Sequence, residues 1–174
     1  MDGHWAEKAI DYVTEKGYFK GIGSKKFGPN IPMTRGMMIT ILGRMDGVKD
    51  HPTKTNFKDV KEADFYAAHV QWALENKIAE GTGQGQFEPN RKITREEMAK
   101  MMNDYRTYKK VDLKKSQKAG LKDQGQIAGW ARESIAKMYQ AGILNGTPEG
   151  NFKPKDLSTR AEVATVLYQM DTNK

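Results

Sequence analysis

The chain has 174 residues, a formal net charge of +7 and a sequence pI of about 9.4. It contains no cysteine, which excludes disulfides and thiolate metal sites and suits an exported protein as well as a cytosolic one. No apolar run approaches the ~20 residues that a membrane-spanning helix needs, so membrane insertion is not expected. The positive charge favours a polyanionic partner such as nucleic acid, an anionic polysaccharide or a membrane surface.

The first predicted element is a helix near the N-terminus. Its apolar residues recur at the spacing of one helix face, and a glycine follows where a left-handed C-terminal cap would end it. The stripe consists of Ala6, Ala9, Ile10 and Val13, and the glycine is Gly17. Because the first five residues enter this element partway and no signal peptide precedes them, we expect an excised fragment with an added start residue.

A loop and a second helix complete this first unit. The loop has the form Gly-x-x-x-x-x-Phe-x-Pro, in which the glycine permits a positive φ, the phenylalanine anchors the loop and the proline stops a strand or helix from continuing. The helix begins at Thr34-Arg35, where the threonine is a favourable N-cap. Its apolar stripe consists of Met38, Ile41, Leu42 and Met45.

The same unit occurs twice more along the chain. Thr-Arg recurs at Thr94-Arg95 and Thr159-Arg160, so the arginines are 60 and then 65 residues apart. A proline, a phenylalanine and a glycine stand five, seven and thirteen residues before each threonine. Glu97 and Glu162 predict capping boxes, whereas Met37 stands at that position in the first unit. A register shared by three segments indicates a repeat protein.

A unit of roughly 50 residues would be marginally stable alone, because too little surface is buried at that size. We therefore predict an all-α domain in which three helix-loop-helix repeats pack around a pseudo-threefold axis. The repeats are placed at residues 1–47, 56–105 and 121–171, and linkers 48–55 and 106–120 join them into one cooperative domain. We interpret the lysine-rich second linker as a solvated face, with loose attraction to an anionic wall as the alternative.

Three motifs in this order resemble the S-layer homology module. They are a Phe-x-Asp-Val segment, here Phe57 to Val60, a Gly-x-Phe-x-Pro loop and a Thr-Arg-Ala-Glu helix start. The resemblance covers essentially the whole chain and departs from the motif at Gly36-Met37 and at Glu96. It implies a three-pronged bundle with ligand grooves between neighbouring repeats. The departures in repeat one predict a weaker site there.

The resemblance also implies a function and a location. Members of the family anchor S-layer proteins and surface enzymes non-covalently to a secondary cell-wall polymer that typically has a pyruvyl ketal on an N-acetylmannosamine. The arginines that match the family's ligand-recognising position are Arg35, Arg95 and Arg160. We therefore expect a pyruvylated, anionic cell-wall polysaccharide as the partner. The expected location is extracellular, in the cell wall or S-layer of a Gram-positive-type bacterium, with the fragment monomeric.

Physical chemistry supports these arginines as anion-binding residues. A guanidinium can bind both oxygens of a carboxylate, and an arginine in the first turn of a helix stands near backbone N–H groups and the positive helix end. A cation there mildly disfavours the helix, so its threefold repetition indicates a task outside helix stability. The alternative is that each arginine only bonds a neighbouring repeat and holds the units together.

Other candidate ligand-binding residues share equivalent positions between repeats. The loop glycines Gly21, Gly81 and Gly146 shape the backbone and also let a ligand approach closely. Tyr12 and Trp72 occupy one off-stripe position, where a sugar platform and simple packing are both open. An aromatic residue precedes or opens the first helix of each repeat, and we favour core packing over sugar stacking for this set: Trp5, Phe65 and Trp130.

Catalysis finds little support in the sequence. The three histidines occupy non-equivalent positions, and Glu96 and Glu97 would point in different directions from a helix. No EF-hand, other metal site or cofactor motif is present, so we expect neither an enzyme nor a bound metal. A nonspecific polyanion or nucleic-acid binding domain is the alternative function, but the repeat of a single arginine disfavours it, as it disfavours a purely structural oligomerisation module.

Overall fold

The computed structural model describes residues 3–21, 26–114 and 118–172. This part of the chain forms six α-helices and one short 3-10 helix and contains no strand longer than an isolated bridge, which confirms the all-α prediction. The elements are α1 (Glu7–Glu15), α2 (Arg35–Met45), α3 (Ala67–Glu75), α4 (Arg95–Tyr108), η1 (Gln124–Gln126), α5 (Gly129–Gln140) and α6 (Arg160–Thr172).

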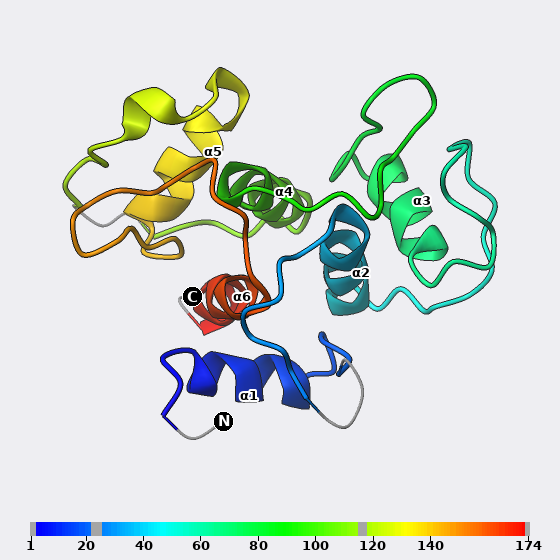
Figure 1. Cartoon of the computed structure of the whole chain (residues 1–174), viewed down its shortest axis with the longest axis horizontal. Helices are drawn as coiled ribbons and strands as arrows, with labels where there is room; N and C mark the ends of the chain where they lie inside the picture. The colour runs from blue at the N-terminus through cyan, green and yellow to red at the C-terminus, as the bar shows by residue number, and fades with distance from the viewer. Residues whose placement is uncertain (1–2, 22–25, 115–117, 173–174) are drawn as a thin grey trace.

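The helices pack in pairs that join different repeats. Helix α2 packs against α3, α4 against α5, and the C-terminal α6 against the N-terminal α1, so the arrangement closes into a ring. Figure 1 shows the three lobes that result, with α2, α4 and α6 around the centre and α1, α3 and α5 outside them. Each lobe therefore combines the second helix of one repeat with the first helix of the next.

Three backbone hydrogen bonds mark the centre of the ring. The amide of Met33 donates to the carbonyl of Ser158 at 2.8 Å, Ser158 donates to Ile93 at 3.0 Å, and Ile93 donates to Met33 at 3.0 Å. These residues are fully buried and occupy equivalent positions just before α2, α6 and α4. A closed triangle of this kind relates the repeats by a pseudo-threefold axis, as the sequence predicts.

The apolar stripes of the three central helices meet around this axis. Six of their residues are fully buried, two from each helix: Met38, Leu42, Met98, Met102, Val163 and Leu167. The loop phenylalanines Phe87 and Phe152 are also buried, and the buried apolar residues of all repeats form one continuous cluster. The core is thus shared between the units, because none of them encloses a stripe by itself.

Local hydrogen bonds explain why the repeated motifs have their spacing. Thr94 and Glu97 form a reciprocal capping box, and Thr159 pairs with Glu162 in the same way. In repeat one Thr34 still accepts a hydrogen bond from the amide of Met37, but the reciprocal half is missing, as predicted. These contacts fix where each arginine-bearing helix begins.

An aspartate of the segment before each first helix holds the following loop. Asp59 accepts hydrogen bonds from the amides of Phe87 and Glu88, and Asp123 does the same for Phe152 and Lys153. The matching Asp2 of repeat one lies outside the described residues. The aspartate of the Phe-x-Asp-Val motif is therefore an anchor for the loop that faces the arginine.

The first helices end in left-handed caps, and the loop glycines serve a different purpose. Gly17 and Gly142 have φ values of 72° and 75°, and Lys77 adopts 57° at the equivalent position of repeat two. The expectation of positive φ is wrong for Gly81 and Gly146. A Cβ on Gly81 would lie 2.7 Å from the ring of Phe57, and one on Gly146 would lie 3.0 Å from a backbone oxygen, so glycine is required there by close packing.

Candidate functional site

The described residues form three equivalent grooves, and each takes residues from all three repeats. We name them after the arginine that lines each. The Arg35 groove contains Gly81 and Trp130, the Arg95 groove contains Gly146 and Trp5, and the Arg160 groove contains Gly21 and Phe65. In every case the arginine comes from one repeat, the glycine loop from the next and the aromatic ring from the remaining one.

Each guanidinium reaches across the repeat boundary and lies on the loop of the next repeat. Arg160 donates from Nε to the carbonyl of Phe27 at 2.7 Å and from Nη2 to that of Lys20 at 3.1 Å. Its guanidinium carbon lies 4.7 Å from the ring centre of Phe27. The other two arginines make the equivalent contacts with Phe87 and Glu80, and with Phe152 and Asn145. Two donor positions of every guanidinium are thereby fixed by backbone oxygens.

The helix N-termini do not supply the free N–H groups that the sequence predicts. The first two amides of α2 donate to the carbonyls of Arg91 and Pro89, and those of α4 and α6 donate to the corresponding residues of the next repeat. The third amide is capped by the side chain of Thr34, Thr94 or Thr159. An anion in a groove therefore meets the guanidinium and the loop, and not the end of the helix.

The three aligned aromatic residues are exposed, and our expectation of core packing is wrong. Trp5, Phe65 and Trp130 are 68%, 53% and 54% exposed, although each lines one of the grooves. They precede or open their first helices, so the apolar face of the helix does not carry them into the core. An apolar ring held open beside a cation is suited to the face of a sugar.

Tyr12 and Trp72 do not lie in the grooves. Trp72 is 9% exposed, donates from Nε1 to Asp46 at 3.1 Å and packs against two tyrosines of the α4 region. Tyr12 packs edge-on against Tyr168 and donates to Asp171 at 3.2 Å. Tyr12 fills the contact between α1 and α6, Trp72 packs between α3 and α4, and neither lines a groove with an arginine.

In the Arg95 groove a carboxylate of the protein occupies the remaining edge of the guanidinium. Arg95 Nη1 lies 2.6 Å from Glu162 Oε1, and the second oxygen of Glu162 accepts from the amide of Thr159. Glu162 therefore caps α6 and binds the arginine of the preceding repeat at the same time. The Arg95 side chain is 15% exposed despite this contact.

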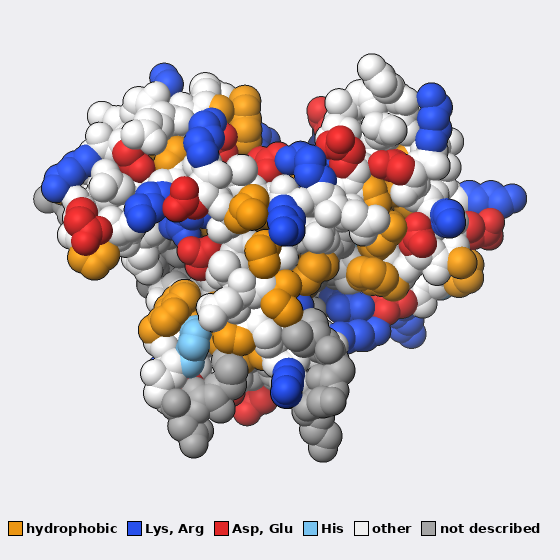
Figure 2. All heavy atoms as spheres, in the orientation of Figure 1, with side chains coloured by type: hydrophobic (Ala, Val, Ile, Leu, Met, Phe, Trp, Pro, Cys, Tyr) orange, Lys and Arg blue, Asp and Glu red, His pale blue; other side chains and the backbone are white. Residues whose placement is uncertain are grey.

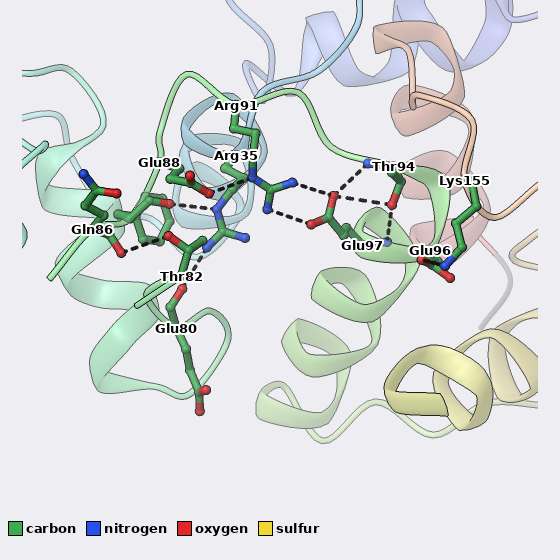
Figure 3. A network of polar contacts seen from close by, with 11 residues as sticks. Arg35, Glu80, Thr82, Gln86, Glu88, Arg91, Thr94, Glu96, Glu97 and Lys155 are labelled. Carbon is green, nitrogen blue, oxygen red and sulfur yellow. Dashed lines mark hydrogen bonds and ion pairs between the residues drawn. The ribbon is translucent and has the colours of Figure 1, made fainter. Parts of the chain in front are cut away.

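In the Arg35 groove the corresponding glutamate is turned to a second arginine. Glu97 binds Arg91 at 2.7 Å, and Arg91 also binds Glu88 at 2.9 Å (Figure 3). Burial lowers the pKa of Arg35, and Arg91 lowers it further, while Glu97, Glu88 and Asp59 act in the opposite direction. Charges of both signs thus surround Arg35, although no carboxylate among the described residues contacts it at ion-pair distance.

The Arg160 groove has Met37 where the other two repeats have glutamate. Burial alone lowers the pKa of Arg160, and no described carboxylate opposes this effect. Asp50 lies in the same groove, but Lys20, Arg44 and His69 bind it at 2.6, 3.2 and 2.8 Å. Partial burial tends to raise the pKa of Asp50, and these three hydrogen bonds outweigh that effect and hold it well below its usual value.

Glu96, a departure from the family motif, has a structural task. It is buried, accepts a hydrogen bond from the amide of Ala128 at 2.9 Å and pairs with Lys155. It therefore joins the start of α4 to the start of α5 and to the loop of repeat three. This long-range partner could not be identified from the sequence.

The described residues contain no cluster of three or more histidines and carboxylates that could hold a metal ion. Within the same ranges, no helix combines the length and apolar character needed to cross a bilayer. Figure 2 shows acidic and basic side chains interspersed over the visible face, in place of a continuous basic stripe.

Comparison with known proteins agrees with the geometry. The S-layer homology domain matches residues 1–37, 56–99 and 120–164. An amylopullulanase of Thermoanaerobacterium thermosulfurigenes is 33% identical over 95% of the chain, and the S-layer protein sap of Bacillus anthracis is 30% identical over 97%. A cellulosome-anchoring protein of Acetivibrio thermocellus is 28% identical over 86% of the chain. The chain spans 9%, 20% and 34% of the length of these three proteins.

Proposed function

Because the chain belongs to the S-layer homology family, we propose that it anchors a larger surface protein by binding an anionic, pyruvylated cell-wall polysaccharide in its three grooves. Family membership places the module at the surface of a Gram-positive-type bacterium, in association with the cell wall. The module is not catalytic, and relatives named as enzymes match it only through this region.

The observation that supports this proposal is the threefold repetition of one composite groove. A guanidinium, a loop glycine and an exposed aromatic ring come from three different repeats and meet three times. Packing alone does not require the exposed rings, because a Trp at 68% exposure contributes little to the core. The combination matches an acidic sugar, which presents a carboxylate and an apolar ring face on one small ligand.

The guanidinium is the proposed binding site of the pyruvyl carboxylate. Nε and Nη2 are held on loop carbonyls, so the orientation of the remaining edge is fixed before the ligand arrives. The contact between Arg95 and Glu162 supports this assignment, because a carboxylate already binds that edge at 2.6 Å. Bidentate or charge-assisted contacts of this kind are about twice as strong as neutral hydrogen bonds.

The arginines also hold neighbouring repeats together, and this task accompanies ligand binding. Each one bonds two backbone oxygens of the next repeat and covers its buried phenylalanine or partly buried Phe27. We propose that the three repeats consequently unfold as one cooperative domain. No groove would survive the removal of a repeat, because each groove takes one element from every repeat.

Nonspecific polyanion binding is the alternative, and the distribution of charge disfavours it. Two basic residues of the second linker already bind groups of the protein itself. Lys109 binds Asp46 at 2.6 Å, and Arg106 donates to the carbonyl of Val111. The visible surface mixes both signs of charge (Figure 2). A nucleic-acid site would instead align cations and aromatics along one surface.

Calorimetry with purified wall polymer, before and after removal of the pyruvyl groups, tests the proposal. We expect binding to the pyruvylated polymer to persist at several hundred millimolar salt and to disappear without the pyruvyl ketal. Binding to DNA or heparin should fade over the same titration, because the Debye length falls from ~10 Å at 0.1 M to ~3 Å at 1 M. A parallel loss of wall polymer and DNA binding with salt would favour the nonspecific alternative.

A further inference from the structure

The three grooves differ in charge although their architecture is the same. Among the described residues, two cationic side chains and two carboxylates line the Arg95 groove. Four cations and three carboxylates line the Arg35 groove. Three cations and a single carboxylate, Asp50, line the Arg160 groove. The Arg160 groove therefore has the largest excess of positive charge.

The residue three positions after each N-cap threonine contributes to this difference. It faces the arginine of the preceding repeat, and it is Glu162 for Arg95, Glu97 for Arg35 and Met37 for Arg160. A glutamate at this position closes the capping box and brings a carboxylate into the groove. Methionine does neither, so the Arg160 groove lacks the internal anion that the Arg95 groove contains.

Arg160 is consequently a buried cation without a protein counterion in the described part of the chain. It is 4% exposed, and its two hydrogen-bond acceptors are uncharged carbonyls. A charge held in this way is costly unless an anion accompanies it, and attraction to an anion is strong where water is scarce. Asp50 does not supply that anion, because Lys20, Arg44 and His69 already bind it.

In the Arg95 groove a ligand carboxylate must displace Glu162 before it can bind. The displaced glutamate would lose the contact with Arg95 while still capping α6, and two carboxylates beside one guanidinium would repel each other. This internal competitor reduces the affinity of the groove for any anion. The Arg35 groove is intermediate, since Glu97 lies nearby but binds Arg91.

On the basis of the proposed function, we infer that the Arg160 groove, at the junction of repeats three and one, is the principal carboxylate site of this module and that the Arg95 groove is the weakest. The departures in repeat one predict a weaker site there, but Met37 lines the groove of Arg160, and Arg35 of repeat one ranks between the other two arginines. Met37 leaves the capping box of α2 incomplete, and it also leaves Arg160 without a glutamate that would compete with a ligand.

Two substitutions at the third residue after the N-cap threonine, each with a matched control, test the inference without changing an arginine. Met37→Glu installs the competitor in the Arg160 groove, and Met37→Gln is its matched control, because both side chains can complete a capping box. Glu162→Gln removes the competitor from the Arg95 groove, and Glu149→Gln, which changes the same charge at an exposed position outside the grooves, is its control. Thermal unfolding of every variant shows whether the fold is retained.

The probe is a pyruvylated N-acetylmannosamine monosaccharide, titrated calorimetrically into the intact module. Met37→Glu should weaken the tightest binding step by about tenfold or more relative to Met37→Gln, and Glu162→Gln should strengthen the weakest step by a similar factor. Equal affinity of the Met37→Glu and Met37→Gln proteins, both folded, would overturn the groove assignment while leaving the proposed function intact. A parent protein that does not bind the probe or the pyruvylated polymer would instead refute the proposed function itself.

Discussion

The Arg95 and Arg160 grooves are built from equivalent residues yet hold their guanidinium groups in opposite electrostatic states. Arg95 is 15% exposed in its side chain and neutralised by Glu162, whereas Arg160 is almost completely buried and has only carbonyl partners among the described residues. The third residue after the N-cap threonine makes this difference, because it is Glu162 beside Arg95 and Met37 beside Arg160. A residue that caps one helix can therefore also determine the charge beside the arginine of the preceding repeat.

Removal of the arginines should produce the largest effects and should rank the grooves. Arg160→Ala is expected to weaken polymer binding most, Arg35→Ala less and Arg95→Ala least, with a loss on the order of 1.5–3 kcal/mol at the strongest groove. Each change also leaves two loop carbonyls without a donor and should lower the free energy of unfolding by about 1–3 kcal/mol.

Affinity measured by calorimetry must therefore be compared at a temperature where each arginine variant is folded, as judged by circular dichroism. Equal losses from the three substitutions would contradict the ranking. Unchanged binding by a folded triple variant would leave the arginines with only their structural contacts.

The exposed rings allow a smaller test that separates binding from stability. Phe65→Ala alters the Arg160 groove and Trp5→Ala alters the Arg95 groove, and both residues are more than half exposed. We expect changes in unfolding free energy within about 0.5 kcal/mol, as for other exposed positions. Phe65→Ala should weaken polymer binding on the order of 1 kcal/mol, through loss of apolar contact with the sugar, and more than Trp5→Ala does. Identical affinity of the Phe65→Ala and parent proteins would show that the ring is not a sugar platform.

A separate effect concerns pH and His69, which binds Asp50 of the Arg160 groove. Burial lowers the pKa of His69 below its usual value of 6.5, and the hydrogen bond to Asp50 opposes this effect without cancelling it. The unfolded chain then takes up a proton that the folded protein does not. The free energy of unfolding should keep its full value above about pH 6.5. Below that pH it should decline by no more than about 1.4 kcal/mol per pH unit, and the decline should end once the pH reaches the lowered pKa.

Denaturant unfolding between pH 7.5 and 5 checks this prediction. His69→Ser, which introduces the residue found at the equivalent Ser134, should remove the decline in that window. A parent protein whose stability is constant or rises as the pH falls from 6.5 would show that the sign is wrong.

Sequence patterns predicted most of the fold because the repeats obey local rules. The stripe residues Met38, Met98 and Val163 are buried, the capping boxes form where Thr-Arg-x-Glu occurs, and left-handed caps follow the first helices. The pseudo-threefold axis was also predicted, because the apolar stripe of each repeat is too small to form a core alone and the three stripes must share one. These features depend on periodicity and on neighbours within a few residues.

The details of the site depended on contacts between repeats and were less predictable. The helix amides were expected to face a ligand, but carbonyls of the next repeat, such as that of Pro89, accept their hydrogen bonds. Trp72 was placed among the candidate ligand residues, yet it packs in the contact between α3 and α4. Alignment of the repeats showed that Trp5 and its counterparts occupy equivalent positions, but it did not show that their side chains are exposed. They are exposed because they lie at or before the helix start. The sequence signal for these residues was a position that is aromatic in all three repeats and lies outside the apolar stripe.

A crystal structure of the module with the pyruvylated monosaccharide, at a concentration below that of the binding sites, would show directly which groove binds the carboxylate. We expect the ligand in the Arg160 groove, with its carboxylate on the guanidinium, its sugar ring beside Phe65 and the Arg95–Glu162 contact still intact. Ligand bound first in the Arg95 groove, or held in any groove without contact between its carboxylate and the arginine, would contradict it.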